Sequence, residues 1–551
     1  MISAMRFSSC ARALRRCVLA VLFGLIATAA SALDLHTATI ADLNAAFADG
    51  SLTSEKLVGI YLARLQAYDK QGPTINTVIA ANGKALEEAR RLDAERKAGK
   101  IRGPLHGIPI VLKDNFDTVD MPTTAGSQLL AGSMPPDDAF LVKRLRAAGA
   151  IILAKVNLHE FAAGGGVGGA TDPAILKAGA VPNGFSSMGG QTRNPHDLTR
   201  GPAGSSTGTA AAIAAVLAQF GMGSDTTSSV RGPASASGVV GFKPTNGLLS
   251  RDGIVPLALT LDTAGPLTRS VYDVAVAMNV LAGVDPADSS TSKSKGHIEK
   301  DYTAFLKAGA LKGVRIGIAR DFNGQNADVD RVFETAVANL RKLGATTTDF
   351  HYPLAMLEKR LDIANVICAA EFKAQIADYL KTTGPKYPKT LDDLARLAND
   401  PKTGYRSPEK AYGLKYTAAH APALNDPIYL AAKGEGIAMV KAAIDEVMTA
   451  NRFDVIVYVS SPNAAPFIAP PKDPRPASAT GSAYNLSNIA GYPDLVVPAG
   501  MTADGLPVTI SFLGSAFSDG RILGYGYDFE QATKALRLPR HTPALASDAI
   551  K

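Results

Sequence analysis

The chain has 551 residues, of which 46% are hydrophobic and 19% are charged, a composition typical of a globular protein with a large core. Its formal net charge is +7, but four arginines and no acidic residue lie within the first 32 positions, so the remainder carries only +3. Lysine and arginine form no stripe interleaved with aromatic side chains. The sequence therefore excludes extensive disorder and gives no indication of a nucleic-acid partner.

The first 32 residues have the three-part layout of a secretory signal. Four arginines are followed by an apolar run from Val18 to Ala27 and then by Ala30-Ser31-Ala32, after which we expect cleavage. The apolar run is too short to span a bilayer, and no later run reaches the roughly 18 apolar residues of a membrane helix, so we expect no stable membrane insertion. The pair Arg15-Arg16 leaves a twin-arginine signal open, although the general export route fits better. We expect a periplasmic or secreted protein.

From residue 33 onward, helix-like and strand-like segments alternate. Helices are predicted over 54–68, 82–97, 138–148 and 207–219, and strands over 108–112, 151–154, 220–224, 313–319 and 453–459. Residues 285–300 are polar and predict a surface loop. Strands separated by helices predict an α/β fold with a mostly parallel sheet covered on both faces. We expect a single domain over residues 33–551, with a mostly helical region around 354–448 as a cap or flank.

Metal and cofactor motifs are missing from the sequence. The eight histidines form no H-E-x-x-H motif and no Cys/His cluster, and Cys368 is the only cysteine after residue 32. Gly164 to Gly169 fits G-x-G-x-x-G, but it follows no clear strand, and Asp172 and Pro173 prevent a helix from opening after it. We therefore expect no metal, no cofactor and no internal disulfide.

Serines and small residues concentrate between Arg200 and Thr245. They lie in Gly201-Pro-Ala-Gly-Ser205-Ser206-Thr-Gly-Thr-Ala-Ala-Ala and in Gly223-Ser-Asp225-Thr-Thr-Ser228-Ser229-Val-Arg231-Gly-Pro. Upstream, Lys113 follows the apolar run Ile108-Pro-Ile-Val-Leu112. Burial disfavours the charged form of a lysine, and a neutral amine can deprotonate one hydroxyl that in turn deprotonates another. The pattern is typical of serine chemistry without histidine.

Other interpretations of the same residues stay open at this point. Lys113 could be a surface charge or the partner of Asp114, and the serine segments could be loops and helix caps. Gly204-Ser-Ser206-Thr-Gly208 also fits G-x-S-x-G, which would make Ser206 a nucleophile and require a later aspartate and histidine. The available histidines are His297, His351, His420 and His541. None of them lies in a segment whose residues suggest a catalytic loop.

Motifs along nearly the whole chain after residue 32 resemble, in order, those of the amidase signature family. They are Arg102-Gly-Pro-Leu-His-Gly-Ile-Pro-Ile-Val-Leu-Lys113-Asp-Asn, Thr123-Thr-Ala-Gly126-Ser, Ala148-Gly-Ala-Ile-Ile-Leu-Ala-Lys-Val-Asn157-Leu-His-Glu160-Phe, Gly190-Gln-Thr-Arg-Asn-Pro195, the serine segments, Gly241-Phe-Lys-Pro-Thr245, Asp262-Thr-Ala-Gly-Pro266, and Asn488-Ile-Ala-Gly-Tyr-Pro493. The segment from Gly247 to Pro256 is similar to the peptide amidase branch. The resemblance implies a large mixed, mostly parallel twisted sheet covered by helices.

The resemblance also implies a Ser, cis-Ser, Lys triad that hydrolyses carboxylic amides through a seryl acyl-enzyme. Lys113 is similar to the family's base, Ser205 to its bridging serine and Ser229 to its nucleophile. Backbone N–H groups of Thr226, Thr227 and Ser228 are expected to form the oxyanion hole. Asp225 and Arg231 are similar to residues that support this loop. The implied substrate is a small-molecule or peptide amide, and we expect a monomer or homodimer.

The sequence departs from the family pattern beside the nucleophile. The family usually has two glycines there, whereas this chain has Thr227 and Ser228, and Ala203 and Thr207 also stand where glycines are common. A β-branched residue such as Thr227 would be strained if the loop required a positive φ. We therefore expect a slightly different loop with two more hydroxyls.

Two other functions remain compatible with these residues. One is a glutaminase-like component of a transamidating complex, which parts of the chain resemble. The predicted export argues against it, because such a component works beside a tRNA-binding partner in the cytoplasm. The other is a non-catalytic amide-binding relative, which the presence of all three triad residue types disfavours.

Overall fold

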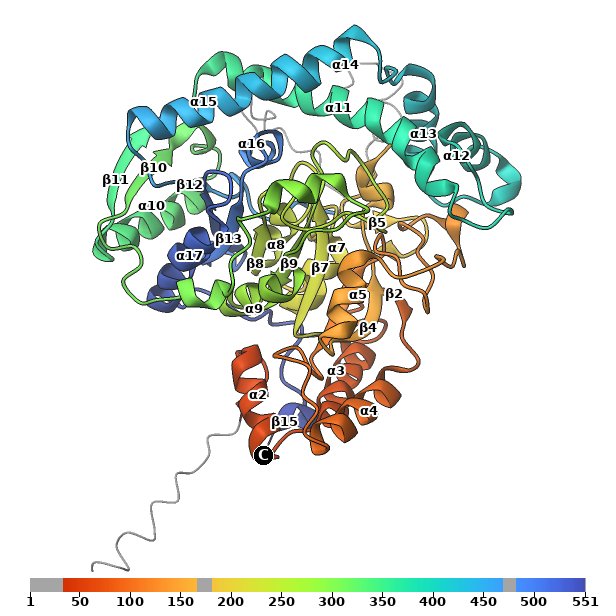
Figure 1. Ribbon diagram of the computed structural model, residues 1–551, viewed down its shortest axis with the longest axis vertical. Helices are drawn as coiled ribbons and strands as arrows, with labels where there is room; N and C mark the ends of the chain where they lie inside the picture. The colour runs from red at the N-terminus through yellow and green to blue at the C-terminus, as the bar shows by residue number, and fades with distance from the viewer. Residues whose placement is uncertain (1–32, 166–180, 469–481, 551) are drawn as a thin grey trace, which may run out of the picture.

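An 11-stranded sheet forms the centre of the molecule in the computed structural model, which describes residues 33–165, 181–468 and 482–550 (Figure 1). The strands lie in the order β11 (Thr346–Phe350), β10 (Arg315–Ala319), β12 (Val455–Val459), β14 (Pro507–Leu513), β13 (Asp494–Met501), β8 (Val240–Lys243), β9 (Thr263–Thr268), β7 (Phe220–Asp225), β3 (Pro109–Lys113), β4 (Ile151–Val156) and β2 (Val78–Ala81). Two small sheets pair β1 (Leu33–Asp34) with β15 (Ala549–Ile550) and β5 (Phe185–Ser186) with β6 (Gly190–Gln191). The predicted α/β class with a large mixed sheet is confirmed.

The balance of strand directions differs from the prediction. In the large sheet, β10 pairs in parallel with β11 and β12, and β3 pairs in parallel with β4 and β7. The other six described pairings in that sheet are antiparallel. The expected parallel majority is therefore wrong: β8, β9, β13 and β14, which periodicity did not single out, return the chain antiparallel between the parallel groups.

Helices cover both faces of the sheet. Every residue of β3, β4, β7, β8, β9, β12 and β14 is buried, and successive side chains of a strand point to opposite faces, so neither face meets solvent along these strands. The surrounding helices are α2 (Ile40–Asp49), α3 (Ser54–Tyr68), α4 (Ala85–Lys97), α5 (Phe140–Ala147), α7 (Thr207–Ala214), α8 (Arg231–Ser237), α9 (Val271–Leu281), α10 (Ala327–Lys342), α16 (Tyr484–Ala490) and α17 (Asp519–Thr533).

The region around 354–448 is chiefly helical, as predicted. It contains α11 (Leu354–Leu380), α12 (Leu391–Ala398), α13 (Pro408–His420), α14 (Pro427–Ala431), a π-helical turn η7 (Ala432–Gly436) and α15 (Ile437–Ala450). Figure 1 shows α11 and α15 running along the top of the molecule, above the sheet. A second, smaller apolar core packs Phe372, Ile376 and Leu414 of this region against Phe161 and Val255. The helical flank thus contacts the segments that lead to the site.

Predicted boundaries agree with the structure where periodicity was strong. The helix over 54–68 is α3, and the strand predicted over 108–112 is β3, shifted by one residue. The helix predicted over 207–219 ends early, at Ala214, because Val216 adopts a left-handed φ of 55°. The polar loop over 285–300 contains one 3-10 turn, η3 (Ser289–Ser294).

Charge pairing ties the two ends of the described chain to the sheet. Arg64 is fully buried and donates to Asp548 at 2.6 Å and to the carbonyl oxygens of Ala215, Val216 and Thr542. Within the described residues no helix is long and apolar enough to cross a bilayer. The predicted signal and the last four residues of the Gly164–Gly169 run lie outside the described residues.

Candidate active site

Two adjacent strands bring the lysine and the serine segments to one edge of the sheet. β3 and β7 are parallel, with Ile110 opposite Phe220 and Leu112 opposite Met222. Their carboxyl ends therefore meet at the same edge, where Lys113 ends β3 and Asp225 ends β7. The topology thus places both predicted groups beside each other before any side-chain contact is considered.

The Lys113 amine is enclosed by hydroxyl groups. Its Nζ lies 2.7 Å from Ser205 Oγ, 2.9 Å from Ser224 Oγ and 3.3 Å from the Ser224 carbonyl oxygen. Asn115 Nδ2 donates to the same Ser224 Oγ at 3.0 Å. Lys113 itself is fully buried. The predicted contact between Lys113 and Ser205 is therefore present.

Burial changes the charge of this lysine. Desolvation lowers the pKa of Lys113 from its usual 10.5 to about 7, although Asp225 and Asp262 oppose the shift. A substantial fraction of the amine is therefore neutral at physiological pH. A neutral amine has a lone pair that can accept the Ser205 proton, while its two N–H bonds are satisfied by Ser224.

The alternative interpretation of Lys113 as the partner of Asp114 does not hold. Asp114 lies 3.3 Å from Lys155 Nζ, and both of these side chains are fully buried. Asp114 also accepts hydrogen bonds from the backbone and side chain of Thr124. The acid next to Lys113 in sequence is thus committed to another cation.

Ser205 lies just before α7, on a backbone of unusual geometry. The peptide bond between Gly204 and Ser205 is cis, as the resemblance implies. The Ser205 carbonyl accepts the backbone N–H of His159 at 3.0 Å, and His159 Nε2 accepts the N–H of Gly184 at 2.8 Å. Desolvation lowers the pKa of His159 to about 4, so its ring is neutral. A Cβ on Gly204 would lie 2.4 Å from this ring, which explains the glycine.

Ser229 lies in the turn between β7 and α8 and is almost completely buried. The Ser229 carbonyl accepts the backbone N–H of Ser206 at 3.0 Å, which joins the two serine segments directly. Within the described part of the chain, the backbone N–H groups of Thr226 to Ser229 have no hydrogen-bond acceptor. Such a row of unpaired donors can bind a developing oxyanion.

The two residues that replace glycines cause no backbone strain. The positive-φ residues include neither Thr227 nor Ser228, and both side chains are only half-buried. The concern that Thr227 would need a left-handed conformation is thus removed. Ala203, before Gly204, does have a φ of 58°, so the glycine-to-alanine departure there is the strained one.

A buried charge network holds the turn that carries Ser229. Asp225 accepts the backbone N–H of Val230 at 2.9 Å and two hydrogen bonds of 3.1 Å from the Arg231 guanidinium. Burial by itself would raise the pKa of Asp225, but Arg231 and the Val230 N–H lower it to about 2. Asp225 therefore stays ionised and supports the turn without moving protons.

The same network extends to the C-terminal part of the chain. Arg231 donates to Asp494 at 2.6 Å, and Asn488 Nδ2 donates to Asp225 Oδ1 at 3.0 Å and to the Asp225 carbonyl at 3.2 Å. Asp225, Arg231 and Asp494 are fully buried. Although burial opposes it, attraction to both aspartates raises the pKa of Arg231, so the guanidinium remains charged.

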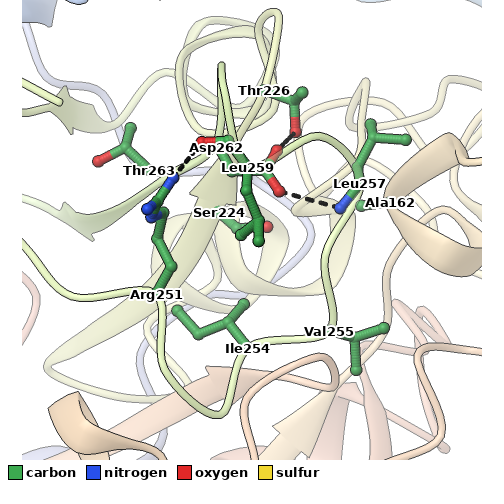
Figure 2. Close-up of a pocket in the computed structure, with 10 residues that line it drawn as sticks. All are labelled: Ala162, Ser224, Thr226, Arg251, Ile254, Val255, Leu257, Leu259, Asp262 and Thr263. Atoms are coloured by element: carbon green, nitrogen blue, oxygen red, sulfur yellow. Dashed lines mark hydrogen bonds between the residues drawn. The ribbon is translucent and has the colours of Figure 1, made fainter. Parts of the chain in front are cut away.

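A small pocket adjoins Ser224 and Thr226. Figure 2 shows Asp262 between Thr226 and Leu257: it accepts the Thr226 hydroxyl at 2.5 Å and the backbone N–H groups of Leu257 and Ala258 at 2.9 and 3.0 Å. The remaining wall is largely apolar and comprises Ala162, Ile254, Val255, Leu257 and Leu259. Apolar walls with a few fixed polar groups suit the organic part of a small substrate.

A strained turn contributes Ala162 to this pocket. Phe161, Ala162 and Ala163 have φ values of 53°, 53° and 81°, a rare run of left-handed residues other than glycine. The flanking Glu160 accepts the Tyr405 hydroxyl, and Lys410 of α13 donates to the Gly164 carbonyl. The helical flank therefore holds the turn in place beside the site.

The G-x-S-x-G interpretation is not supported. The Ser206 hydroxyl donates to the Ser224 carbonyl at 3.3 Å, and Ser206 precedes the first residue of α7. Among the described residues, none of the four candidate histidines contacts it: His297 stacks on Phe517, His351 pairs with Asp321, His420 stacks on Tyr416, and His541 contacts Arg540.

Sequence reasoning missed several groups at the site. Ser224, the second hydroxyl partner of Lys113, was passed over although it lies next to Asp225 at the end of a predicted strand. Its signal was the register of β7 on β3, which pairs Met222 with Leu112. Asn488 and Asp494 follow Arg231 by 257 and 263 residues, so no local pattern connected them to it.

Comparisons with known proteins agree with this geometry. A family model described as Amidase matches residues 56–523. The chain belongs to the amidase signature family. The amidase-like subunit of the glutamyl-tRNA(Gln) amidotransferase of Caldanaerobacter subterraneus subsp. tengcongensis is 35% identical over 508 residues, covering 91% of this chain and 98% of that relative. A probable amidase of Arabidopsis thaliana is 32% identical over 521 residues, 93% of each chain.

A solved amidase has the same architecture. The crystal structure of the native peptide amidase from Stenotrophomonas maltophilia superposes with a TM-score of 0.81 and 37% sequence identity, covering 92% of this chain and 99% of that one. As a member of the amidase signature family, this protein is an amidohydrolase that acts on amide bonds.

Gly204→Ala tests how tightly the site is packed. The added Cβ collides with the His159 ring, whose position is fixed by Gly184, so we expect a loss of about 1–3 kcal/mol in stability and reduced turnover. Melting temperature and ammonia release measure both effects. Gly232→Ala is the matched control, because its Cβ has no neighbour closer than 3.7 Å. Wild-type values for Gly204→Ala would contradict the close packing.

Proposed function

We propose that this protein is an exported serine amidase that hydrolyses a carboxylic amide, with a peptide amide as the preferred substrate class. The observation that carries the proposal is the buried Lys113 amine, partly neutral at physiological pH and 2.7 Å from Ser205 Oγ. The segment of that serine is hydrogen-bonded to the Ser229 turn. Base, relay and nucleophile thus occupy one edge of the sheet.

Acylation begins with two linked proton transfers. Neutral Lys113 accepts the Ser205 hydroxyl proton, Ser205 accepts the Ser229 proton, and Ser229 Oγ forms a bond to the amide carbon. The carbonyl oxygen becomes an oxyanion and is bound by backbone N–H groups of Thr226 to Ser229. The tetrahedral intermediate collapses when a proton returns through Ser205 to the amide nitrogen. The C–N bond breaks, ammonia or an amine leaves, and Ser229 holds the acyl group.

Deacylation uses the same relay with water as the nucleophile. The relay takes one proton of a water molecule, whose oxygen attacks the ester carbon. The bond to Ser229 Oγ then breaks, the proton passes to that oxygen, and the carboxylic acid leaves. Ser229 and neutral Lys113 are restored, so the cycle consumes one amide and one water and needs no cofactor.

The substrate class is supported by the pocket and by the structural relative. The apolar wall of Ala162, Ile254, Val255, Leu257 and Leu259 suits a neutral organic group beside the scissile amide. A structural relative that covers 92% of this chain is a peptide amidase. Export, supported by the three-part pattern of residues 1–32, would give a monomeric or homodimeric enzyme access to external peptides.

A second candidate is a glutaminase-like component of an amidotransferase. It is favoured by the 35% identical relative, an amidotransferase component that this chain matches over 98% of its length. In this candidate the substrate is glutamine, and the ammonia is passed to a partner protein. The triad chemistry is the same, so substrate and location must separate the two.

Serine substitutions test the assigned roles. We expect Ser229→Ala to abolish labelling by a serine-reactive phosphonate and to remove ammonia release from a peptide amide. Ser205→Ala should lower kcat by about 1000-fold or more, because the proton relay is broken. Ser206→Ala and Ser228→Ala are matched controls that should stay within about tenfold of wild type, since their backbone N–H groups remain. Full turnover by Ser229→Ala would refute the nucleophile assignment.

The pH profile tests Lys113 as the base. Below the pKa of about 7 the amine is protonated and cannot accept the Ser205 proton, so kcat/KM should fall about tenfold per pH unit on the acid side and level off above pH 7. Lys113→Ala should lose most activity and also lose this acid limb. Lys415→Ala, an exposed lysine of α13, should keep it. An acid limb that persists unchanged in Lys113→Ala would assign the titration to another group.

Substrate and location separate the two candidates. We expect higher kcat/KM for ammonia release from peptide amides than from glutamine, fatty amides or aryl amides. We also expect a periplasmic or secreted protein that begins at Leu33 and purifies as a monomer or homodimer. A preference for glutamine, an uncleaved cytoplasmic chain and a stoichiometric protein partner would together favour the amidotransferase component.

A further inference from the structure

A second cavity, of about 470 Å³, lies beneath the helical flank. Its walls are the segment after β8, the 3-10 turn η3, helices α11 and α15, the π-turn η7 and the end of α16. Arg251 and Leu259 line both this cavity and the pocket of Figure 2, so they form the partition between them. The volume falls within the range of roughly 300–1,000 Å³ found for small-molecule sites.

The charge of the cavity has one sign. Arg251, Lys293, Lys433 and Lys441 line it, and its lining residues include no aspartate or glutamate among those the structure describes. Cations that converge on a concave surface raise the local concentration of anions. A ligand that enters this cavity is therefore expected to carry negative charge.

Two of the four cations have structural partners. Arg251 donates to Asp288 at 2.5 and 2.8 Å, and Lys433 lies 3.1 Å from the buried Glu371. Lys433 also lies in the π-turn Ala432–Gly436, a rare backbone form that is frequent at functional sites. These two side chains thus belong to the frame of the cavity.

The other two cations are available to a ligand. Within the described part of the chain, neither Lys293 nor Lys441 has a carboxylate at ion-pair distance, and both are exposed to solvent. Lys441 Nζ lies 5.7 Å from the centre of the Tyr492 ring. Ile437 and Ile489 add apolar surface to the same cavity. The cavity therefore combines two unneutralised cations with surface for a short carbon skeleton.

We propose that this cavity binds a small organic anion, with a carboxylate or phosphate group paired with Lys293 and Lys441 and its carbon skeleton against Ile437 and Ile489. The site is separate from the catalytic one, because the Arg251 and Leu259 partition lies between it and the Ser224–Thr226 pocket. Asn488 lines the cavity and also donates to Asp225. A bound anion thus lies one side chain from the support of the nucleophile turn.

Calorimetric titration tests the proposal with succinate and, separately, inorganic phosphate as probes. The full chain is titrated at constant ionic strength set with chloride. One equivalent of at least one probe should bind, and Lys293→Gln/Lys441→Gln should weaken that binding about tenfold or more, since two charged contacts are lost. Lys342→Gln/Lys402→Gln removes the same charge from exposed positions outside the cavity and should leave binding unchanged.

The outcomes distinguish this site from the catalytic one. Binding of succinate alone assigns a carboxylate ligand, and binding of phosphate alone assigns a phosphate ligand. Binding should survive when Ser229 is blocked by a covalent phosphonate or replaced in Ser229→Ala, and this result stands whether or not the proposed amidase function is correct. The proposal is overturned if neither probe binds, if both double variants weaken binding equally, or if blocking Ser229 abolishes it.

Discussion

Removal of water from one lysine amine is the constraint on which the rest of the site depends. Lys113 ends a strand that is buried on both faces, and desolvation outweighs the attraction of Asp225 and Asp262. If Lys113 reached solvent, its amine would be protonated and could not accept a proton from Ser205. The large sheet, with β3 in its interior between β7 and β4, is what keeps water away.

The fold also has to keep a second set of charges ionised within a few residues of that neutral amine. Asp225, Arg231 and Asp494 are as deeply buried as Lys113 but are paired with each other at 2.6 to 3.1 Å. Opposite charges in contact compensate for lost hydration, whereas Lys113 has only hydroxyl and carbonyl partners. The difference between a charged support and a neutral base is therefore set by neighbours and not by depth of burial.

Local patterns were sufficient to predict part of this arrangement. The apolar run before Lys113 predicted its strand to within one residue, and family motifs assigned Lys113, Ser205 and Ser229 to segments that do meet. Periodicity could not supply the antiparallel strands or the pairing of Ser224 with Lys113, because strand partners are chosen by tertiary packing. It also could not show whether Thr227 accepts the loop, since its φ follows from contacts made elsewhere.

The network around Arg231 has a consequence for the order in which the chain becomes competent. Lysine, relay and nucleophile all lie between residues 113 and 229, but Asp494 and Asn488 follow Arg231 by 263 and 257 residues. A nascent chain that has emerged only as far as α15 carries every reacting atom while the Arg231 guanidinium still lacks two of its partners. The last fifth of the polypeptide thus acts as a built-in delay, holding back an ordered nucleophile turn until synthesis is nearly finished.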